Sequence, residues 1–348
     1  MKFLRSSNRR SSPKRLRFRG LLISCLAAVA ITPLAAEEGA APSVLAREPV
    51  ARPRTPHGYA IYPPGNRQYL PGPSLSAELL AHKPIEWILW RDRWKYMEPT
   101  KDAYDLSLMK KELARYFAAG KKAGILVMTG SDCTPSWLPG PRHQGVLVPW
   151  ADSIAVEFDE LLGEIAKLEV TPGIPLKDDP RLVLVYPTGP TVPSHEMHLH
   201  GMEKAPGFSH EKMYQAWAKA IDSQHRHFPD VAGGLAISVQ APVRGYLNRV
   251  IDKLQLTKGK QLATFQHNGL SNKVGIRTGG YGAHRRLFEL HAQGWTVGAE
   301  MLTSATVSPR WMETNDVMAA IGHLPIGEFF VAYAPDWQQL KTPTPSSP

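Results

Sequence analysis

The sequence predicts an α/β protein whose single domain is a closed (β/α)₈ barrel. Eight short apolar runs lie along the chain, and amphipathic stretches fill most of the gaps between them. This alternation is typical of βα units that build a parallel sheet. A doubly wound sheet is the second architecture that such a pattern allows. It is disfavoured because no glycine-rich phosphate-binding turn follows the first run.

The eight expected strands are short and apolar, and the chain of 348 residues is long enough for a barrel of roughly 250 residues with insertions. They are Gly58–Tyr62, Ile85–Trp90, Gly124–Met128, Leu182–Tyr186, Leu235–Val239, Leu262–Gln266, Trp295–Glu300 and Phe329–Tyr333.

Helical segments are expected between several of these strands, because apolar residues recur there at spacings of three and four. The stripes are Leu106, Met109, Leu113, Tyr116 and Phe117; then Val156, Leu161, Leu162, Ile165 and Leu168; then Met213, Trp217, Ala220 and Ile221; and last Val317, Ala320 and Ile321.

The positive charge of the chain is concentrated at its start. The formal net charge is +10, but eight of the 41 Lys and Arg residues lie in the first nineteen positions. The remaining 33 face 31 Asp and Glu, so the body of the protein is nearly neutral. A basic surface for nucleic acid is therefore not expected.

This basic run precedes an apolar stretch, Leu21–Ala36, which is short for a membrane span. The pattern is typical of a secretory signal peptide, so we expect residues 1–36 to be cleaved and the mature chain to be secreted or periplasmic, with no membrane attachment. Two alternatives are an uncleaved anchor and a lipid attached at Cys25. Cys133 would be the one cysteine of the mature chain, which excludes an internal disulfide.

The predicted domain organisation follows from composition. Residues 37–56 are rich in Ala, Pro and Arg without periodicity and are expected to be a linker. Residues 57–340 form the predicted barrel, and residues 341–348, mostly Thr, Pro and Ser, form a predicted disordered tail.

Polar side chains are dense where the expected strands end. In barrels of this type, catalytic groups come from the carboxyl ends of the strands. Candidates there are Arg91, Trp94 and Glu98 after the second strand, Asp132 after the third, and His195, Glu196, His198 and His200 after the fourth. Gln266, His267 and Asn268 end the sixth strand, Glu300 ends the seventh, and Tyr333, Asp336 and Trp337 follow the eighth.

One segment resembles a known family. The stretch Trp90-Arg91-Asp92-Arg93-Trp94-Lys95-Tyr96-Met97-Glu98-Pro99, followed by Tyr104-Asp105, is similar to the Arg-x-x-Trp-x-x-x-Glu-Pro…Tyr-Asp segment of the clan A glycoside hydrolases, in particular the β-galactosidase-like enzymes. Pro135-Ser136-Trp137-Leu138 is similar to a turn that follows the next strand in that clan.

The resemblance implies a retaining glycosidase without a cofactor. In the clan, the acid/base follows strand four and the nucleophile ends strand seven, and Glu196 and Glu300 occupy those places. The chain departs from the clan at His195, where an Asn that contacts the sugar 2-hydroxyl is usual. A His can donate a similar hydrogen bond to the sugar. The activity of the site therefore depends on how well His195 replaces that Asn.

The chemistry of glycoside hydrolysis agrees with a pair of carboxyl groups. One must be protonated to assist the leaving oxygen, and the other must be ionised to attack the anomeric carbon. In a retaining enzyme the two groups lie about 5–5.5 Å apart, and in an inverting enzyme roughly 6.5–9.5 Å apart. Residues expected to contact the carbohydrate are Arg91, Trp94, Asp132, His195, His267, Asn268, Tyr333 and Trp337.

Structural interpretations of the same residues stay open. Arg91 and Glu98 could form an ion pair at the barrel rim. Trp94 fits ordinary packing, whereas Trp337 fits a platform for a sugar face. The segment His195–His200 lacks the spacing of a helical metal motif, so no metal is expected. The alternative function is a carbohydrate-binding barrel that has lost efficient hydrolysis.

Overall fold

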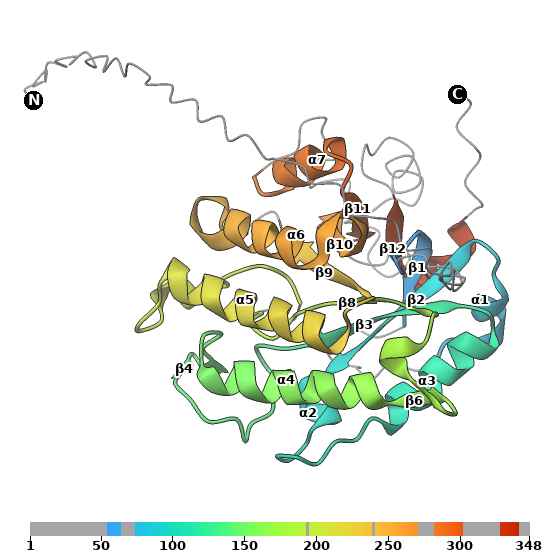
Figure 1. The fold of residues 1–348 in the computed structure, drawn as a ribbon, viewed down its shortest axis with the longest axis horizontal. Coiled ribbons are helices and arrows are strands. Elements are labelled where there is room, and N and C mark those ends of the chain that lie inside the picture. The colour runs from blue at the N-terminus through green and yellow to red at the C-terminus, as the bar shows by residue number, and fades with distance from the viewer. Residues whose placement is uncertain are drawn as a thin grey trace, which may run out of the picture. The chain divides into compact units, whose positions relative to one another are not determined.

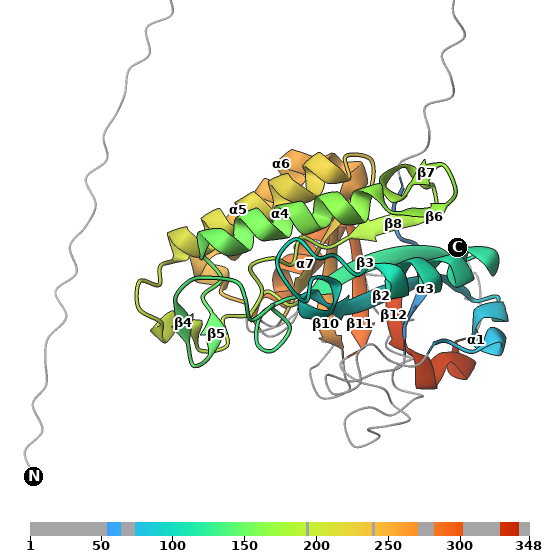
Figure 2. The same cartoon turned by 90° about the horizontal axis from the view of Figure 1, so that it is seen from below.

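The computed structural model describes residues 54–63, 74–192, 195–238, 241–270, 282–301 and 328–340. Eight of its strands form one closed barrel (Figures 1 and 2). In chain order these are β1 (Gly58–Tyr62), β2 (Ile85–Arg93), β3 (Lys122–Met128), β8 (Leu182–Val185), β9 (Ala232–Ile237), β10 (Ala263–Leu270), β11 (Thr296–Met301) and β12 (Phe329–Tyr333).

Every neighbouring pair in the barrel is parallel, and β12 closes it against β1 in the register Gly58↔Phe329 to Tyr62↔Tyr333. Each strand neighbours the next one in chain order. The predicted (β/α)₈ fold is confirmed. Because all strands run in the same direction, their carboxyl ends meet at one face of the barrel.

The expected strands all correspond to observed ones; β1 and β12 have the predicted bounds, and the other six have shifted ends. The clearest shift is in β9, which begins at Ala232, three residues before the predicted start. Gly233 and Gly234 interrupt the apolar pattern, yet both lie within the strand. β10 continues to Leu270, four residues beyond the predicted end, so His267 and Asn268 lie within the strand.

Helices cover the outside of the barrel (Figure 1). They are α1 (Ala77–Ala81), α2 (Trp94–Met97), α3 (Ser107–Ala118), α4 (Asp152–Lys167), α5 (His210–His227), α6 (Asn248–Leu262) and α7 (His284–Ala292). Short 3₁₀ or π segments are η1 (Leu176–Asp178), η2 (Met202–Lys204), η3 (Val243–Leu247) and η4 (Ala334–Gln339). Two small antiparallel hairpins lie outside the barrel, β4 (Arg142–His143) with β5 (Val146–Leu147) and β6 (Glu169–Thr171) with β7 (Ile174–Pro175).

Three of the four predicted helical stripes fall on α3, α4 and α5. Val156 is a wrong assignment, because its side chain is exposed on α4 while Leu161, Leu162 and Ile165 are buried. It lies one position beside the buried Glu157, on the outer flank of the helix. The stripe of Val317, Ala320 and Ile321 lies outside the described residues.

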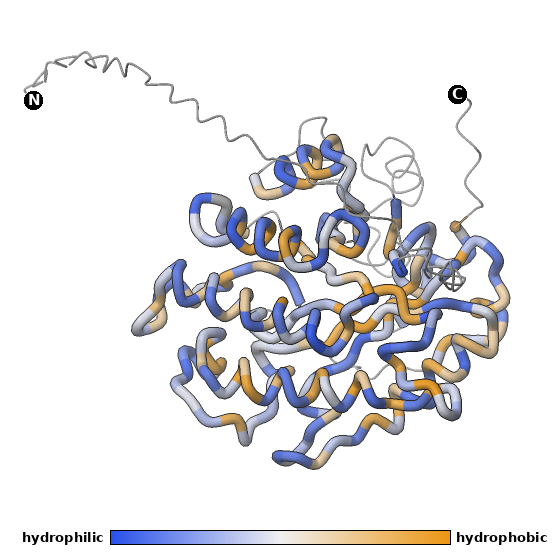
Figure 3. The backbone as a smooth tube through the Cα atoms, viewed as in Figure 1, coloured by the Kyte–Doolittle hydropathy of each residue, from blue (hydrophilic) through white to orange (hydrophobic). Residues whose placement is uncertain are grey.

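Apolar side chains pack in layers on both sides of the strands. One cluster includes Tyr62, Trp87, Leu184 and Phe329, and two larger clusters join the strands to the helices. Figure 3 shows the corresponding pattern, with hydrophobic colour on the central strands and mixed colour along the helices. Dense packing of this kind leaves little room for additional atoms.

Replacing Gly234 by Val is expected to lower the free energy of unfolding by about 1–3 kcal/mol, the usual cost of overpacking a core. A Cβ at this position would lie 2.9 Å from the Tyr186 ring and 3.0 Å from Leu184. Urea denaturation measures the change, with the exposed Val156→Ala as control. A stability equal to that of the wild type would show that the barrel interior is looser than described.

Of the residues that precede the barrel, the structure describes only those from Arg54 onward. The predicted signal peptide, the first part of the predicted linker and the predicted tail lie outside the described ranges. Arg54, within the predicted linker, pairs with Val231 and donates to the Lys177 carbonyl at 2.8 Å. Within the described ranges, no helix combines the length and apolar character that crossing a membrane requires.

Candidate active site

Glu300 lies near the carboxyl end of β11 and is 2% exposed. Its Oε2 accepts a hydrogen bond from Gln266 Nε2 at 2.5 Å and lies 3.3 Å from Nε2 of His195. Gln266 is itself fixed, because its Oε1 accepts a hydrogen bond from the Tyr186 hydroxyl and its Nε2 also donates to Asn268 Oδ1 at 3.1 Å. Side chains from β10 and from the chain that follows β8 therefore hold the Glu300 carboxyl group.

A cationic and aromatic group lies beside this carboxyl. The Arg91 guanidinium lies 4.0 Å above the Tyr62 ring and 5.5 Å from that of Tyr333. Burial opposes the charge of Arg91, but Tyr333, Tyr62 and Glu300 outweigh it and raise its pKa. Arg91 is therefore a permanent cation close to Glu300.

Tyr62 ends β1 and is fully buried, with its ring edge toward His195. Burial and then Glu300 hold the pKa of its hydroxyl well above the ordinary value, so it is a neutral donor. That hydroxyl has no hydrogen-bond partner among the described residues. Neither Tyr62 nor Tyr186 was predicted as a site residue, although both are the last residue of an expected strand.

Glu196 reaches the barrel by an unusual route. The chain leaves the sheet after Val185 and returns at Glu196, which forms a parallel bridge with Ala236 of β9. Met197 N donates to the Ala236 carbonyl at 2.9 Å. Residues 195–197 thus occupy the place where β8 would continue along β9, and the Glu196 side chain is half-buried there.

Tyr333 links the two candidate carboxylates electrostatically. Burial is the largest cause of its pKa of about 12; Arg91 opposes this, while Glu300 and, less strongly, Glu196 raise the pKa further. The structure therefore brings Arg91, His195, Glu196, Glu300 and Tyr333 into one electrostatic environment at the carboxyl face.

His267 does not point toward Glu300, contrary to the expectation that it contacts the carbohydrate. Side chains alternate along a strand, and Gln266 and Asn268 face the carboxyl. His267 therefore points the other way and stacks on His284 of α7, with ring centroids 3.5 Å apart. The strand was predicted to end at Gln266, whereas β10 continues to Leu270. The alternation of side chains along a strand was therefore not applied to His267.

The buried pair predicts a pH-dependent stability. Burial, followed by the neighbouring His284, lowers the pKa of His267 to about 3, and burial lowers the pKa of His284 to about 4. The unfolded chain binds these protons near pH 6.5 and the folded chain does not, so stability is lost as pH falls below about 6.5.

His284→Gln is expected to reduce the loss of unfolding free energy between pH 7 and pH 5 by about 2 kcal/mol relative to the wild type. A Gln amide can still donate to the Ile237 carbonyl, which His284 Nε2 approaches at 3.2 Å. Denaturation at the two pH values gives the difference. Parallel loss in both proteins would mean that His284 is protonated in the folded state.

The other predicted contacts fall in different surroundings. Trp94 is fully buried and donates from Nε1 to Glu98, so it packs and presents no surface to a substrate. Asp132 is exposed and lies 3.2 Å from Arg93. Trp337 belongs to η4, which directly follows the carboxyl end of β12, and its ring lies edge-on to His82 with the ring centroids 5.0 Å apart. Its expected contact with the carbohydrate stays a prediction.

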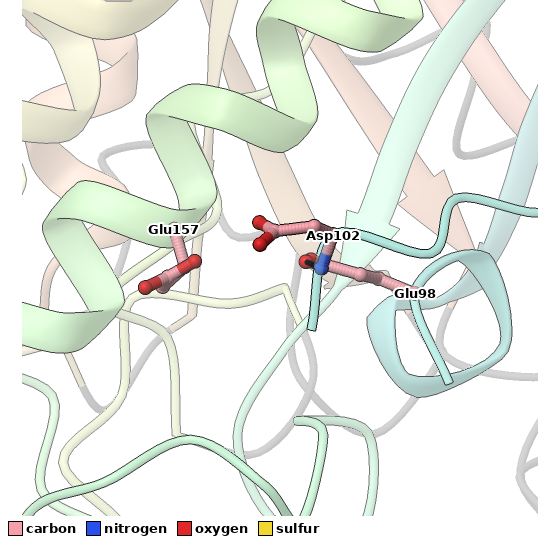
Figure 4. A group of neighbouring side chains, drawn as sticks. All are labelled: Glu98, Asp102 and Glu157. Atoms are coloured by element: carbon pink, nitrogen blue, oxygen red, sulfur yellow. Dashed lines mark hydrogen bonds between the residues drawn. The ribbon is translucent and has the colours of Figure 1, made fainter. Parts of the chain in front are cut away.

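The ion pair considered for Arg91 and Glu98 is not the observed arrangement. Arg91 lies with the tyrosines, whereas Glu98 accepts from Trp94 at 2.8 Å and from the Asp102 amide at 3.2 Å. Carboxyl oxygens of Glu98, Asp102 and Glu157 lie within 4.8 Å of one another (Figure 4). Lys101 pairs with Glu157 at 3.0 Å and offsets part of this charge.

Sequence comparisons do not place the chain in a family. No family model matches it, and no curated protein matches it. Solved structures do match. An exo-β-1,4-mannosidase from Opitutaceae bacterium strain TAV5 shares 12% identity with a TM-score of 0.49, over 80% of this chain and 51% of that one. The chain thus spans about half the length of that enzyme.

Two further structures are an endoglucanase from Pseudomonas stutzeri and a xylanase 10B from Thermotoga maritima. The first has 13% identity and a TM-score of 0.49, over 79% of this chain and 85% of that one. The second has 12% identity and a TM-score of 0.47, over 80% and 82%. These likenesses concern the fold alone.

Proposed function

We propose that this protein is a retaining glycoside hydrolase in which Glu300 is the nucleophile and Glu196 the acid/base. The observation that supports it most is the setting of Glu300, which is buried at the carboxyl face, fixed by Gln266 and accompanied by the Arg91 cation. A nucleophilic carboxylate must be held in one orientation, and the hydrogen bond from Gln266 supports this condition.

In the first step, Glu300 attacks the anomeric carbon as Glu196 gives its proton to the leaving glycosidic oxygen. A covalent glycosyl-enzyme forms and the aglycone departs as an alcohol. In the second step, Glu196 takes a proton from water, which attacks the same carbon and releases Glu300 as a carboxylate.

His195 occupies a sensitive position in this scheme. Its Nε2 lies 3.3 Å from the Glu300 Oε2 and it directly precedes Glu196. When Nε2 carries the proton, His195 donates to Glu300 and supports its orientation. The ring is also close enough to restrict the approach of a sugar to that oxygen.

Hydrolysis of a panel of aryl β-glycosides and β-linked polysaccharides tests the proposal. Turnover by the wild-type protein supports it. Sugar binding without turnover on any substrate would favour the second candidate function, a carbohydrate-binding barrel. The contact of His195 with Glu300 is the observation that favours this second candidate. In that case His195→Asn is the first substitution to examine for a gain of activity.

We also propose export of the chain, based on the basic start and the apolar stretch Leu21–Ala36. Amino-terminal sequencing of protein recovered from the native host would support it by finding a chain that begins after residue 36. Full-length protein in the cytoplasm would contradict it.

A further inference from the structure

We propose that a groove between α4 and α5 binds a neutral glycan chain at a distance from the candidate catalytic carboxylates. This inference rests on the proposed function for the identity of the ligand. The groove has a volume of about 370 Å³ and is lined by the start of both helices and by Gly189 and Pro190. The two helices lie side by side in Figures 1 and 2.

The floor of the groove is aromatic and apolar. Trp150, Ile154 and Phe158 line it, and Trp150 is partly exposed. Phe158 is held firmly, because its ring packs against Trp94 and a Cβ on Gly189 would lie 2.9 Å from it. Tryptophan rings suit the apolar face of a sugar ring, and a rigid floor avoids the entropy cost of ordering it on binding.

The rim carries hydrogen-bonding groups with balanced charge. Two acidic residues, Asp152 and Glu211, face two basic ones, Lys212 and Lys219. Asp152 pairs with Lys219 at 3.1 Å, and Gln215 donates to Glu211 at 2.7 Å. This balance gives no net attraction for a phosphate or nucleic acid, whereas exposed amides, ammonium groups and carboxylates suit hydroxyl groups.

Small residues keep the space open. Ala155 on α4 and Ala216 on α5 line the groove, and both are only partly buried. A longer side chain at either position would project into the space between the helices. A larger side chain in place of Ala155 or Ala216 would therefore fill the groove without removing any contact of the barrel.

The location connects the groove to the proposed chemistry. The first turns of α4 and α5 follow barrel strands, so they lie toward the carboxyl face. Pro190 is six residues before Glu196, a separation of at most about 20 Å for an extended chain. Thr191 and Val192, which follow Pro190, are tied to the chain after β3, since Thr191 bonds Thr129 at 2.5 Å and Ser131 Oγ donates to the Val192 carbonyl at 3.1 Å. A chain of several sugars could occupy both places.

The experiment compares β-1,4-linked xylo-, manno- and gluco-oligosaccharides of two and six units. Hydrolysis is measured in proteins that keep Glu300. Binding is measured by calorimetry in proteins that also carry Glu300→Gln. Trp150→Ala and Ala216→Gln are the groove variants, and Val156→Ala on the exposed side of α4 is the control. Ala216→Gln serves because removal of Trp150 could disturb packing with Phe208. Loss of one aromatic platform is expected to weaken six-unit binding about tenfold, with two-unit binding unchanged.

Five results separate the two proposals and their alternatives. Loss of six-unit binding in both groove variants, with two-unit hydrolysis intact, supports the groove. Hydrolysis with no effect of the groove variants overturns the groove and leaves the glycosidase standing. Groove-dependent binding without hydrolysis overturns the glycosidase alone. No binding and no hydrolysis overturn both, and self-association abolished by Ala216→Gln would assign the groove to a second copy of the chain.

Discussion

Glu300→Gln is expected to lower kcat for glycoside hydrolysis by about 10⁴-fold or more, because a neutral amide cannot form the glycosyl-enzyme. The amide is nearly the same size as the carboxyl group and can keep a contact with Gln266, so folding and sugar binding should change little. Steady-state kinetics on an aryl glycoside gives the loss, and calorimetry gives the affinity.

A matched control separates this effect from a general loss of an acidic group. Glu289→Gln changes an exposed residue of α7 that pairs with Arg286 at 3.1 Å. It should leave both kcat and affinity unchanged. A Glu300→Gln protein that turns over at more than a few per cent of the wild-type rate would exclude Glu300 as the nucleophile.

Glu196→Gln is expected to have an effect that depends on the leaving group. For an alkyl or sugar leaving group, which needs the proton, kcat/KM should fall by about 10²–10⁴-fold, the usual contribution of general acid catalysis. For an activated aryl glycoside, whose phenolate departs without a proton, the fall in kcat/KM should be much smaller. A series of aryl glycosides with different leaving-group pKa values measures this dependence.

An equal loss for all leaving groups would contradict the acid/base assignment and give Glu196 a role in binding or folding. The half-buried position of Glu196 beside β9 makes the distinction necessary, since its bridge with Ala236 also stabilises the loop. Circular dichroism of the variant checks that this loop has not unfolded the barrel.

The barrel could be predicted because its pattern is local. Apolar runs of five or six residues mark each strand, and their spacing leaves room for a crossover helix. The ends of β9 and β10 could not be found in this way. Gly233 and Gly234 are strand residues because Tyr186 and Gln224 pack against them, and neither of these contacts is local in sequence.

The candidate site was predicted in part for the same reason. Glu300 follows a clear apolar strand, so its place at the barrel mouth could be expected. Gln266 and His267 are neighbours in sequence, and a strand sends neighbours to opposite faces. Only the observed register shows that Gln266 holds Glu300 and that His267 stacks on His284. Tyr62 gave no signal, since a tyrosine at a strand end is equally typical of packing.

Mass spectrometry of the protein after reaction with an activated 2-deoxy-2-fluoro-β-glycoside tests the central claim most directly. The fluorine slows both steps, and the activated leaving group allows the first to proceed, so the covalent intermediate accumulates. If Glu300 is the nucleophile, one added glycosyl unit is expected on the peptide that contains Glu300, and none in Glu300→Gln. An adduct on a different carboxylate, or hydrolysis that inverts the anomeric centre, would contradict it.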